Sequence, residues 1–194
     1  MIRRFLVLVV VACALGAVAP AQDVREIRRQ GDSFIRKVQI LEVYNHILPV
    51  LMTPEQLKKL LPLVEQARQE ERDLAKKEIE MMKGMEAKVD AAIAEAERNG
   101  TVPSQEVFRE LQQVDLAIAR LRQMVIQANV ARVYDALKTI LNPGQLKAAA
   151  GTFTIPRVEG QPELTEEEKV KRWIQFILLE AEAYPILIRL SREE

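Results

Sequence analysis

Two long stretches of helical periodicity, joined by a short polar turn, constrain this fold more than any other feature of the sequence. From Thr53 to Asn99 apolar residues recur every three or four positions, and similar spacing returns from Ser104 to Ile140. Two helices of about 40 residues with so short a connection must fold back on each other as an antiparallel hairpin, roughly 60 Å long at 1.5 Å per residue. We therefore expect an elongated all-α fold.

The composition agrees with this prediction. The chain of 194 residues is 48% hydrophobic but only 5% aromatic. Its abundant Ala, Leu, Glu, Lys, Arg and Gln favour long helices over sheets.

The N-terminus has the pattern of a secretory signal peptide, residues 1–21. Two arginines precede an apolar run from Phe5 to about Val18, which is shorter than the ~18 to 20 residues of a membrane span, and small residues follow at Ala19 and Ala21. We expect cleavage before Gln22 and a periplasmic or secreted mature chain. The competing interpretation is a lipoprotein that is cleaved before Cys13 and lipidated there.

The mature chain would be nearly neutral and free of disulfides. Cys13 is the single cysteine, and it lies within the predicted signal peptide. Losing Arg3 and Arg4 from 28 basic residues leaves 26 against 28 acidic ones, a formal charge of −2. This balance gives no indication of a nucleic-acid partner.

The rest of the chain divides into four predicted segments. Residues 22–32 are expected to form a flexible arm, frayed or at most a short helix. Residues 33–150 are predicted to be a helical-hairpin domain that opens with a short helix, and residues 151–164 a linker. Residues 165–194 are predicted to be one apolar C-terminal helix, started by a capping box of Thr165 and Glu168 and kinked at Pro185. Glu180 and Arg189 make a membrane span by this helix unfavourable.

One phrase occurs twice, as "TPEQLK" at residues 53–58 and as "NPGQLK" at residues 142–147. Each copy is a helix start: a capping side chain, a proline suited to the first helical position, and a glutamine able to close a capping box. The residues concerned are Thr53, Pro54, Gln56, Asn142, Pro143 and Gln145. We expect the two copies to meet and to fix the angle of the hairpin against the first helix.

These phrases resemble the LTxxQ motif that occurs twice in the Spy/CpxP family of bacterial periplasmic proteins. The first copy reads "MTPEQ", with Met52 in place of Leu, and the second reads "LNPGQ", with Asn142 in place of Thr. The resemblance covers residues 33–150. It implies a curved, homodimeric helical cradle with ATP-independent chaperone activity, or a stress-sensing or adaptor role. The longer hairpin and the C-terminal helix depart from the family pattern.

Three methionines, Met81, Met82 and Met85, form a local cluster. Thioethers favour Cu(I), so one hypothesis is a soft-metal site. Because the chain has one histidine and no cysteine after the predicted cleavage, we favour an adaptable contact surface and no metal site.

The predicted C-terminal helix is apolar on two faces. One face carries Trp173, Phe176, Leu179 and Leu187. Because a thin hairpin covers only one face, the other must meet the first helix, a second subunit, a client or a membrane. We expect these four residues to contribute to client or partner contact.

Little in the sequence indicates catalysis. His46 is the only histidine, and the mature serines Ser33, Ser104 and Ser191 lie near helix starts or the tail. With no nucleophile beside a base and no phosphate-binding loop, we predict neither an enzyme nor a cofactor. The leading functional hypothesis is a periplasmic holdase for unfolded chains. The alternatives are an adaptor for an envelope sensor or assembly and Cu(I) binding at the methionine cluster.

Overall fold

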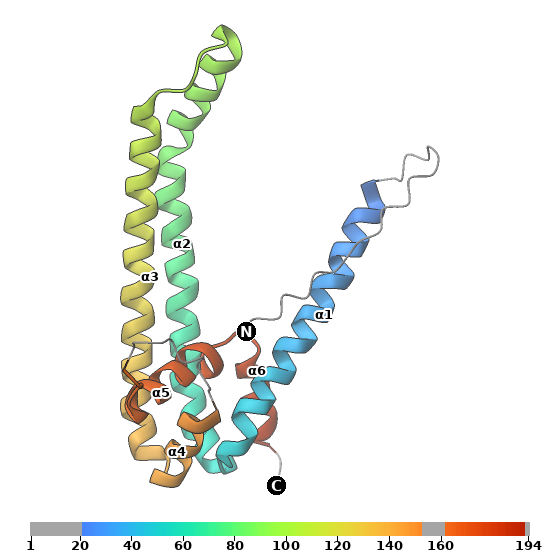
Figure 1. Cartoon of the computed structure of the whole chain (residues 1–194), viewed down its shortest axis with the longest axis vertical. Coiled ribbons are helices and arrows are strands. Elements are labelled where there is room, and N and C mark those ends of the chain that lie inside the picture. Colours follow the sequence, from blue (N-terminus) through green and yellow to red (C-terminus); the bar gives the residue numbers. More distant parts are fainter. Residues whose placement is uncertain (1–20, 153–161, 193–194) are drawn as a thin grey trace. The chain divides into compact units, whose positions relative to one another are not determined.

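The computed structural model describes residues 21–152 and 162–192, and within them the chain is all-α, as the sequence predicts (Figure 1). Residues 1–20 of the predicted signal peptide and residues 153–161 of the predicted linker lie outside this description. The elements are α1 (Ala21–Ile47), the 3₁₀ turn η1 (Leu48–Val50), α2 (Pro54–Asn99), α3 (Gln105–Ile140), α4 (Pro143–Thr152), α5 (Glu166–Trp173), the π-helical turn η2 (Ile174–Leu178) and α6 (Ala183–Leu190).

Helix α1 is longer than the sequence predicts. It begins at Ala21, so residues 22–32 are helical rather than a flexible arm. Gly31 does not end the helix, because one interior glycine costs only about 1 kcal/mol relative to alanine and the neighbouring Arg, Glu and Gln are good helix formers. The chain divides into two units within this helix, the first ending at Val38 and the second beginning at Gln39.

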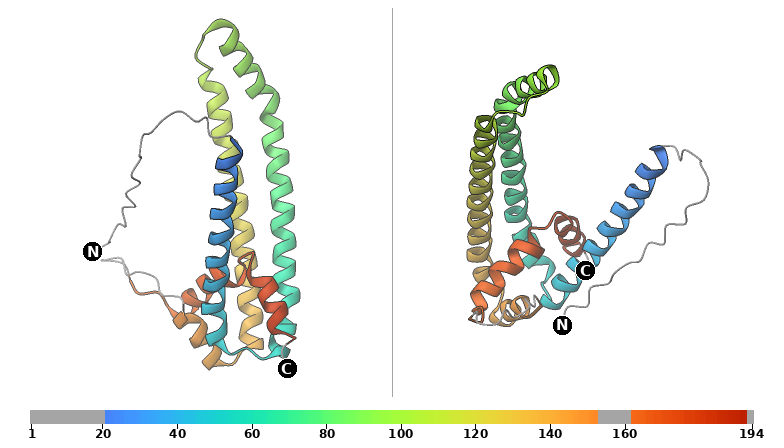
Figure 2. Two further views of the ribbon diagram at one scale, coloured as in Figure 1. Left: turned by 90° about the vertical axis from the view of Figure 1, so that its right-hand side faces the viewer. Right: turned by 45° about the horizontal axis from the view of Figure 1, so that its top comes forward.

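Helices α2 and α3 form the predicted antiparallel hairpin (Figures 1 and 2). Helix α2 ends at Gly100, whose φ of 62° is a left-handed conformation that glycine adopts without strain and whose N–H donates to the Ala96 carbonyl at 2.9 Å. Ser104 then caps α3 by accepting a hydrogen bond from the Glu106 N–H at 3.1 Å. The turn therefore uses the capping residues that the sequence indicated.

Ion pairs join α2 to α3 at three levels of the hairpin. They are Glu70 with Arg132 at 2.8 Å, Glu78 with Arg122 at 2.6 Å and 2.7 Å, and Lys88 with Glu110. The α3 partner moves back along the chain as the α2 partner moves forward, which is the order that an antiparallel pair requires. Of the six residues, Glu78 is the buried one, and two nitrogens of the Arg122 guanidinium bind its carboxylate.

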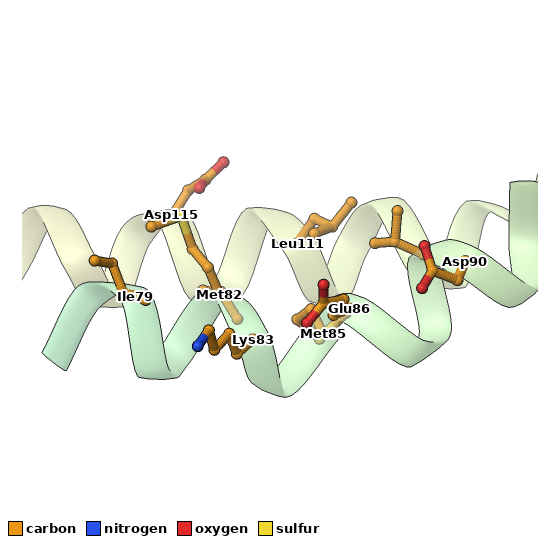
Figure 3. A pocket seen from close by; sticks show the side chains of 10 residues that line it. Ile79, Met82, Lys83, Met85, Glu86, Asp90, Leu111 and Asp115 are labelled. Atoms are coloured by element: carbon orange, nitrogen blue, oxygen red, sulfur yellow. The ribbon is translucent and has the colours of Figure 1, made fainter. Parts of the chain in front are cut away.

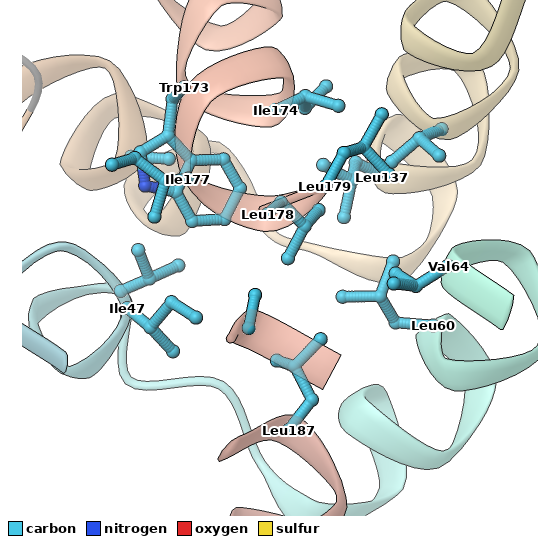
Figure 4. Close-up of a cluster of buried hydrophobic side chains, with 14 of the residues drawn as sticks. Ile47, Leu60, Val64, Leu137, Trp173, Ile174, Ile177, Leu178, Leu179 and Leu187 are labelled. Atoms are coloured by element: carbon cyan, nitrogen blue, oxygen red, sulfur yellow. The ribbon is translucent and has the colours of Figure 1, made fainter. Parts of the chain in front are cut away.

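The core lies where α2 begins and α3 ends (Figure 4). Trp173 is fully buried there, and its indole N–H donates to the backbone carbonyl of His46 at 3.2 Å. Buried apolar residues from both hairpin helices surround it, together with residues of η1, α4, η2, α6 and the end of α1. Examples are Val43, Ile47, Leu60, Val64, Val133, Leu137, Ala149, Ile174, Leu178 and Leu187.

The outer half of the hairpin has almost no core. Between residues 79 and 118 the buried apolar side chains are Met85 and Ile118 alone. Two helices in contact can bury only the stripes that face each other, and no third element of the second unit packs here. The outer half therefore depends on one seam of contacts and its ion pairs.

The C-terminal segment differs from the single kinked helix that the sequence predicts. Helix α5 passes at Trp173 into the π-helical turn, and residues 179–182 form a turn that leads into α6, ahead of Pro185 rather than at it. The break lets α5 pack on α3 and α4 while α6 packs on α2, so both apolar faces are covered within the chain. None of the helices described here has the length and apolar character needed to cross a membrane.

Candidate functional site

Both copies of the repeated phrase start a helix by a capping box. Thr53 Oγ1 accepts from the Gln56 N–H at 3.2 Å, while Gln56 Oε1 accepts from the Thr53 N–H at 2.9 Å. Asn142 and Gln145 make the same two hydrogen bonds, at 2.9 Å and 3.0 Å, where α4 begins. Each pair satisfies two backbone donors that a helix start would leave open.

The two glutamines also bind each other. Gln56 Nε2 donates to Gln145 Oε1, and Gln145 Nε2 donates to Gln56 Oε1, both at 2.9 Å. Each Nε2 donates in addition to a carbonyl two residues before the other phrase, Gln56 to Ile140 and Gln145 to Leu51, again at 2.9 Å. Both amides thereby use all of their donors and acceptors.

We call Thr53, Gln56, Asn142 and Gln145 the motif clasp. The two copies of the phrase meet, as expected from the sequence. Their reciprocal hydrogen bonds tie the start of α2 to the end of α3. The clasp contains no ionisable group, so its chemistry is that of a structural joint. The capping box of Thr165 and Glu168 at the start of α5 is present as well but stands apart from it.

Leu51 has an unusual backbone next to the clasp. Its φ of 52° and ψ of 45° are left-handed, a conformation that disfavours a side chain with a Cβ. Its side chain is 78% exposed, so burial does not compensate for the strain. Its carbonyl, however, accepts from Gln145 Nε2, and its N–H donates to Leu48 at 3.1 Å. The hydrogen bonds of the clasp thus help to hold Leu51 in this geometry.

A shallow groove of about 420 Å³ lies between α2 and α3 in the outer half of the hairpin (Figure 3). We call it the hairpin groove. It is lined by Ile79, Met82, Lys83, Met85, Glu86, Val89, Asp90, Leu111, Val114 and Asp115. Ile79 and Met82 are 49% and 51% exposed, so large apolar side chains border an open space. Ile93 and Phe108 are also about half exposed and lie four residues after Val89 and three before Leu111, the spacing at which helix residues share a face.

Comparison with known proteins adds no relative. No family model, curated protein or solved structure matches the chain. The likeness to the Spy/CpxP family therefore rests on the two motif copies and the order of the predicted elements.

The methionine cluster contributes to the hairpin groove only in part. Met82 and Met85 line it, with Met85 largely buried between the helices, whereas Met81 is not among the lining residues. Among the residues described, no three His, Cys, Asp or Glu side chains come together in an arrangement able to hold a metal ion. Two thioethers line the groove, and their flexible side chains can adapt to different apolar contacts.

The predicted C-terminal contact residues are mostly in the core. Trp173 and Leu187 have no exposed surface and Leu179 is 9% exposed, so these three side chains pack inside the chain rather than toward a client. Phe176 is the exception, at 50% exposure. The sequence showed that both faces were apolar, but the break after the π-helical turn, which lets the chain cover both, has no glycine or proline to announce it.

Two of the serines weighed for catalysis have local structural roles. The Ser104 hydroxyl caps α3, and the Ser191 hydroxyl donates to the Ile188 carbonyl at 2.8 Å. His46 lies at the edge of the core, where its backbone carbonyl receives the Trp173 indole N–H. Sequence reasoning missed the hairpin groove: the apolar stripes of α2 and α3 were visible in the sequence, but the register that leaves Ile79 and Met82 half exposed was not.

Proposed function

We propose that this chain is an exported, ATP-independent holdase that binds unfolded protein segments in the hairpin groove. The observation that carries the proposal is the groove itself, where Ile79 and Met82 stay half exposed over an outer hairpin with little core. Exposed apolar patches on a folded protein are typical of contact surfaces. Binding the unfolded state there would keep it from aggregating.

The cellular setting of this proposal comes from the sequence. The N-terminal pattern favours export, and the resemblance to the Spy/CpxP family favours the periplasm and a stress response. The same resemblance suggests a homodimer, which sedimentation equilibrium of the mature chain would test by its mass. The adaptor hypothesis has less support, because Trp173, Leu179 and Leu187 of the predicted C-terminal contact surface lie in the core. Cu(I) binding stays a prediction, for which Met82 and Met85, three residues apart at the groove, are the available thioethers.

A light-scattering assay of a thermally aggregating client, with the mature protein at equal concentration, tests the function. We expect suppressed aggregation, and we expect the Ile79→Gln/Met82→Gln variant to lose most of the effect. The matched control is Leu116→Gln/Met124→Gln, which replaces one aliphatic residue and one methionine that are equally or more exposed but do not line the groove. Unchanged scattering with the unmodified protein would reject the holdase, and equal losses in both variants would reject the groove as its site.

A further inference from the structure

The hairpin groove carries an uneven charge. Its lining includes the carboxylates of Glu86, Asp90 and Asp115 but only one cation, Lys83. Figure 3 shows the acidic side chains of both helices beside the apolar ones. An occupant of this groove therefore meets an apolar floor and an acidic border.

These three carboxylates differ from the carboxylates that pair α2 with α3, and in this they resemble other exposed ones of α2 such as Glu80 and Glu95. Glu70, Glu78 and Glu110 each have a cationic partner across the hairpin. Within the described part of the chain, the carboxylates of the groove take part in no ion pair or hydrogen bond. Their negative charge is therefore available to a cationic group that enters the groove.

Glu86 and Asp90 also repel each other. They are four residues apart on α2, the spacing at which side chains of a helix lie side by side. Like charges at this spacing destabilise a helix, so their presence here has a local cost. A cation bound between them would relieve that repulsion.

We propose that the hairpin groove selects positively charged amphipathic segments, in which apolar residues alternate with lysine or arginine. This inference rests on the proposed function and names the class of client. From Ile79 to Asp90 the groove follows α2 for about 17 Å at 1.5 Å per residue, which corresponds to about three turns of a bound helix or about five residues of extended chain. The apolar side chains of such a segment occupy the floor, while its cations lie against Glu86, Asp90 and Asp115.

Fluorescence anisotropy with two designed 14-residue peptides tests this selection. Both peptides carry the same leucine stripe, and the polar face is all lysine in one and all glutamate in the other. We expect the mature protein at low salt to bind the lysine peptide at least about tenfold more tightly, and added salt to reduce the difference, because exposed charge pairs are screened.

Two variants with equal charge change locate the effect. Glu86→Gln/Asp90→Asn removes two negative charges from the groove, and Glu80→Gln/Glu95→Gln removes two from positions of the same helix that do not line it. The preference for the lysine peptide should fall several-fold in the first variant and persist in the second.

The result separates this selection from the general function. Equal binding of both peptides, or a preference equally reduced in both variants, would overturn the selection even where the unmodified protein suppresses client aggregation. Failure of the aggregation assay itself would instead reject the holdase.

Discussion

The side-chain amides of Gln56 and Gln145 hydrogen-bond to each other in both directions, although 89 positions separate them in the chain. Each of the two belongs to its own capping box as well. One pair of side chains thus helps to start α2 and α4 and joins the start of α2 to the end of α3. The joint is neutral and satisfied at every polar atom, so it adds rigidity without burying a charge.

A double-mutant cycle should show that this joint acts as a unit. We expect Gln56→Ala and Gln145→Ala each to lower the free energy of unfolding by about 2–3 kcal/mol, since each leaves partly buried polar groups unpaired. The double variant should lose about 1–2 kcal/mol less than the sum of the two. Urea unfolding followed by circular dichroism measures all three, and additive losses would contradict mutual hydrogen bonding.

Leu51 is a position where replacement by glycine should not lower the free energy of unfolding. Its left-handed backbone costs about 1–2 kcal/mol for a residue with a Cβ, whereas glycine adopts it freely at some cost in unfolded-state entropy. We expect Leu51→Gly to change the free energy of unfolding by between zero and about 1 kcal/mol in the stabilising direction. Leu51→Val, β-branched and less tolerant of positive φ, should be destabilised by about 1 kcal/mol. Thermal unfolding midpoints measure both effects. A midpoint for Leu51→Val above that for Leu51→Gly would show that the backbone conformation of Leu51 is unstrained.

Glu78 should make stability depend on pH in the acid range. Hydrogen bonds from the Arg122 guanidinium lower the pKa of its carboxyl in the folded state. The unfolded chain therefore binds a proton at higher pH than the folded one, so the stabilisation is complete above the ordinary glutamate pKa of about 4.3. It is lost as the pH falls from there through the lower folded pKa.

Urea midpoints between neutral pH and the acid range test this assignment. Glu78→Gln should be less stable at neutral pH and should lose less stability on acidification than the unmodified protein. Glu80→Gln, a neighbouring exposed carboxyl, serves as the control and should keep the original pH dependence. Parallel curves for all three proteins would exclude the Glu78–Arg122 pair as a source of acid sensitivity.

Trp173 should be a large contributor to stability and a direct reporter of folding. Trp173→Ala removes a fully buried indole, and we expect a loss of about 3–5 kcal/mol. Phe176→Ala, half exposed three residues later, should cost much less, about 1 kcal/mol. Because Trp173 is the only tryptophan, its emission should shift to the red on unfolding of the unmodified protein. Similar losses for both variants would mean that the C-terminal segment does not supply the core.

The sequence predicted the parts of this fold that depend on local signals. The helix ends at Thr53, Gly100 and Ser104 are marked by capping chemistry, and the two apolar stripes between them define the hairpin. Export, oligomeric state and activity stay predictions, because the described residues and the comparisons do not test them.

What the sequence could not predict depends on long-range packing. The repeated phrase led us to expect that its two copies meet, but nothing near Gln56 indicates that its side-chain amide hydrogen-bonds directly to that of Gln145. The break between η2 and α6 has no local breaker and follows from the need to bury two apolar faces on different neighbours. The groove likewise arises only when the α2 and α3 stripes are set at a definite register.

The core, the motif clasp and the C-terminal segment all lie at one end of the hairpin. The length of α2 and α3 beyond that end is therefore not fixed by these contacts. Whole turns added in equal number to α2 and α3 on either side of Gly100 would lengthen the hairpin without altering any of those contacts. The length of the hairpin can therefore change independently of the packed base that specifies its fold.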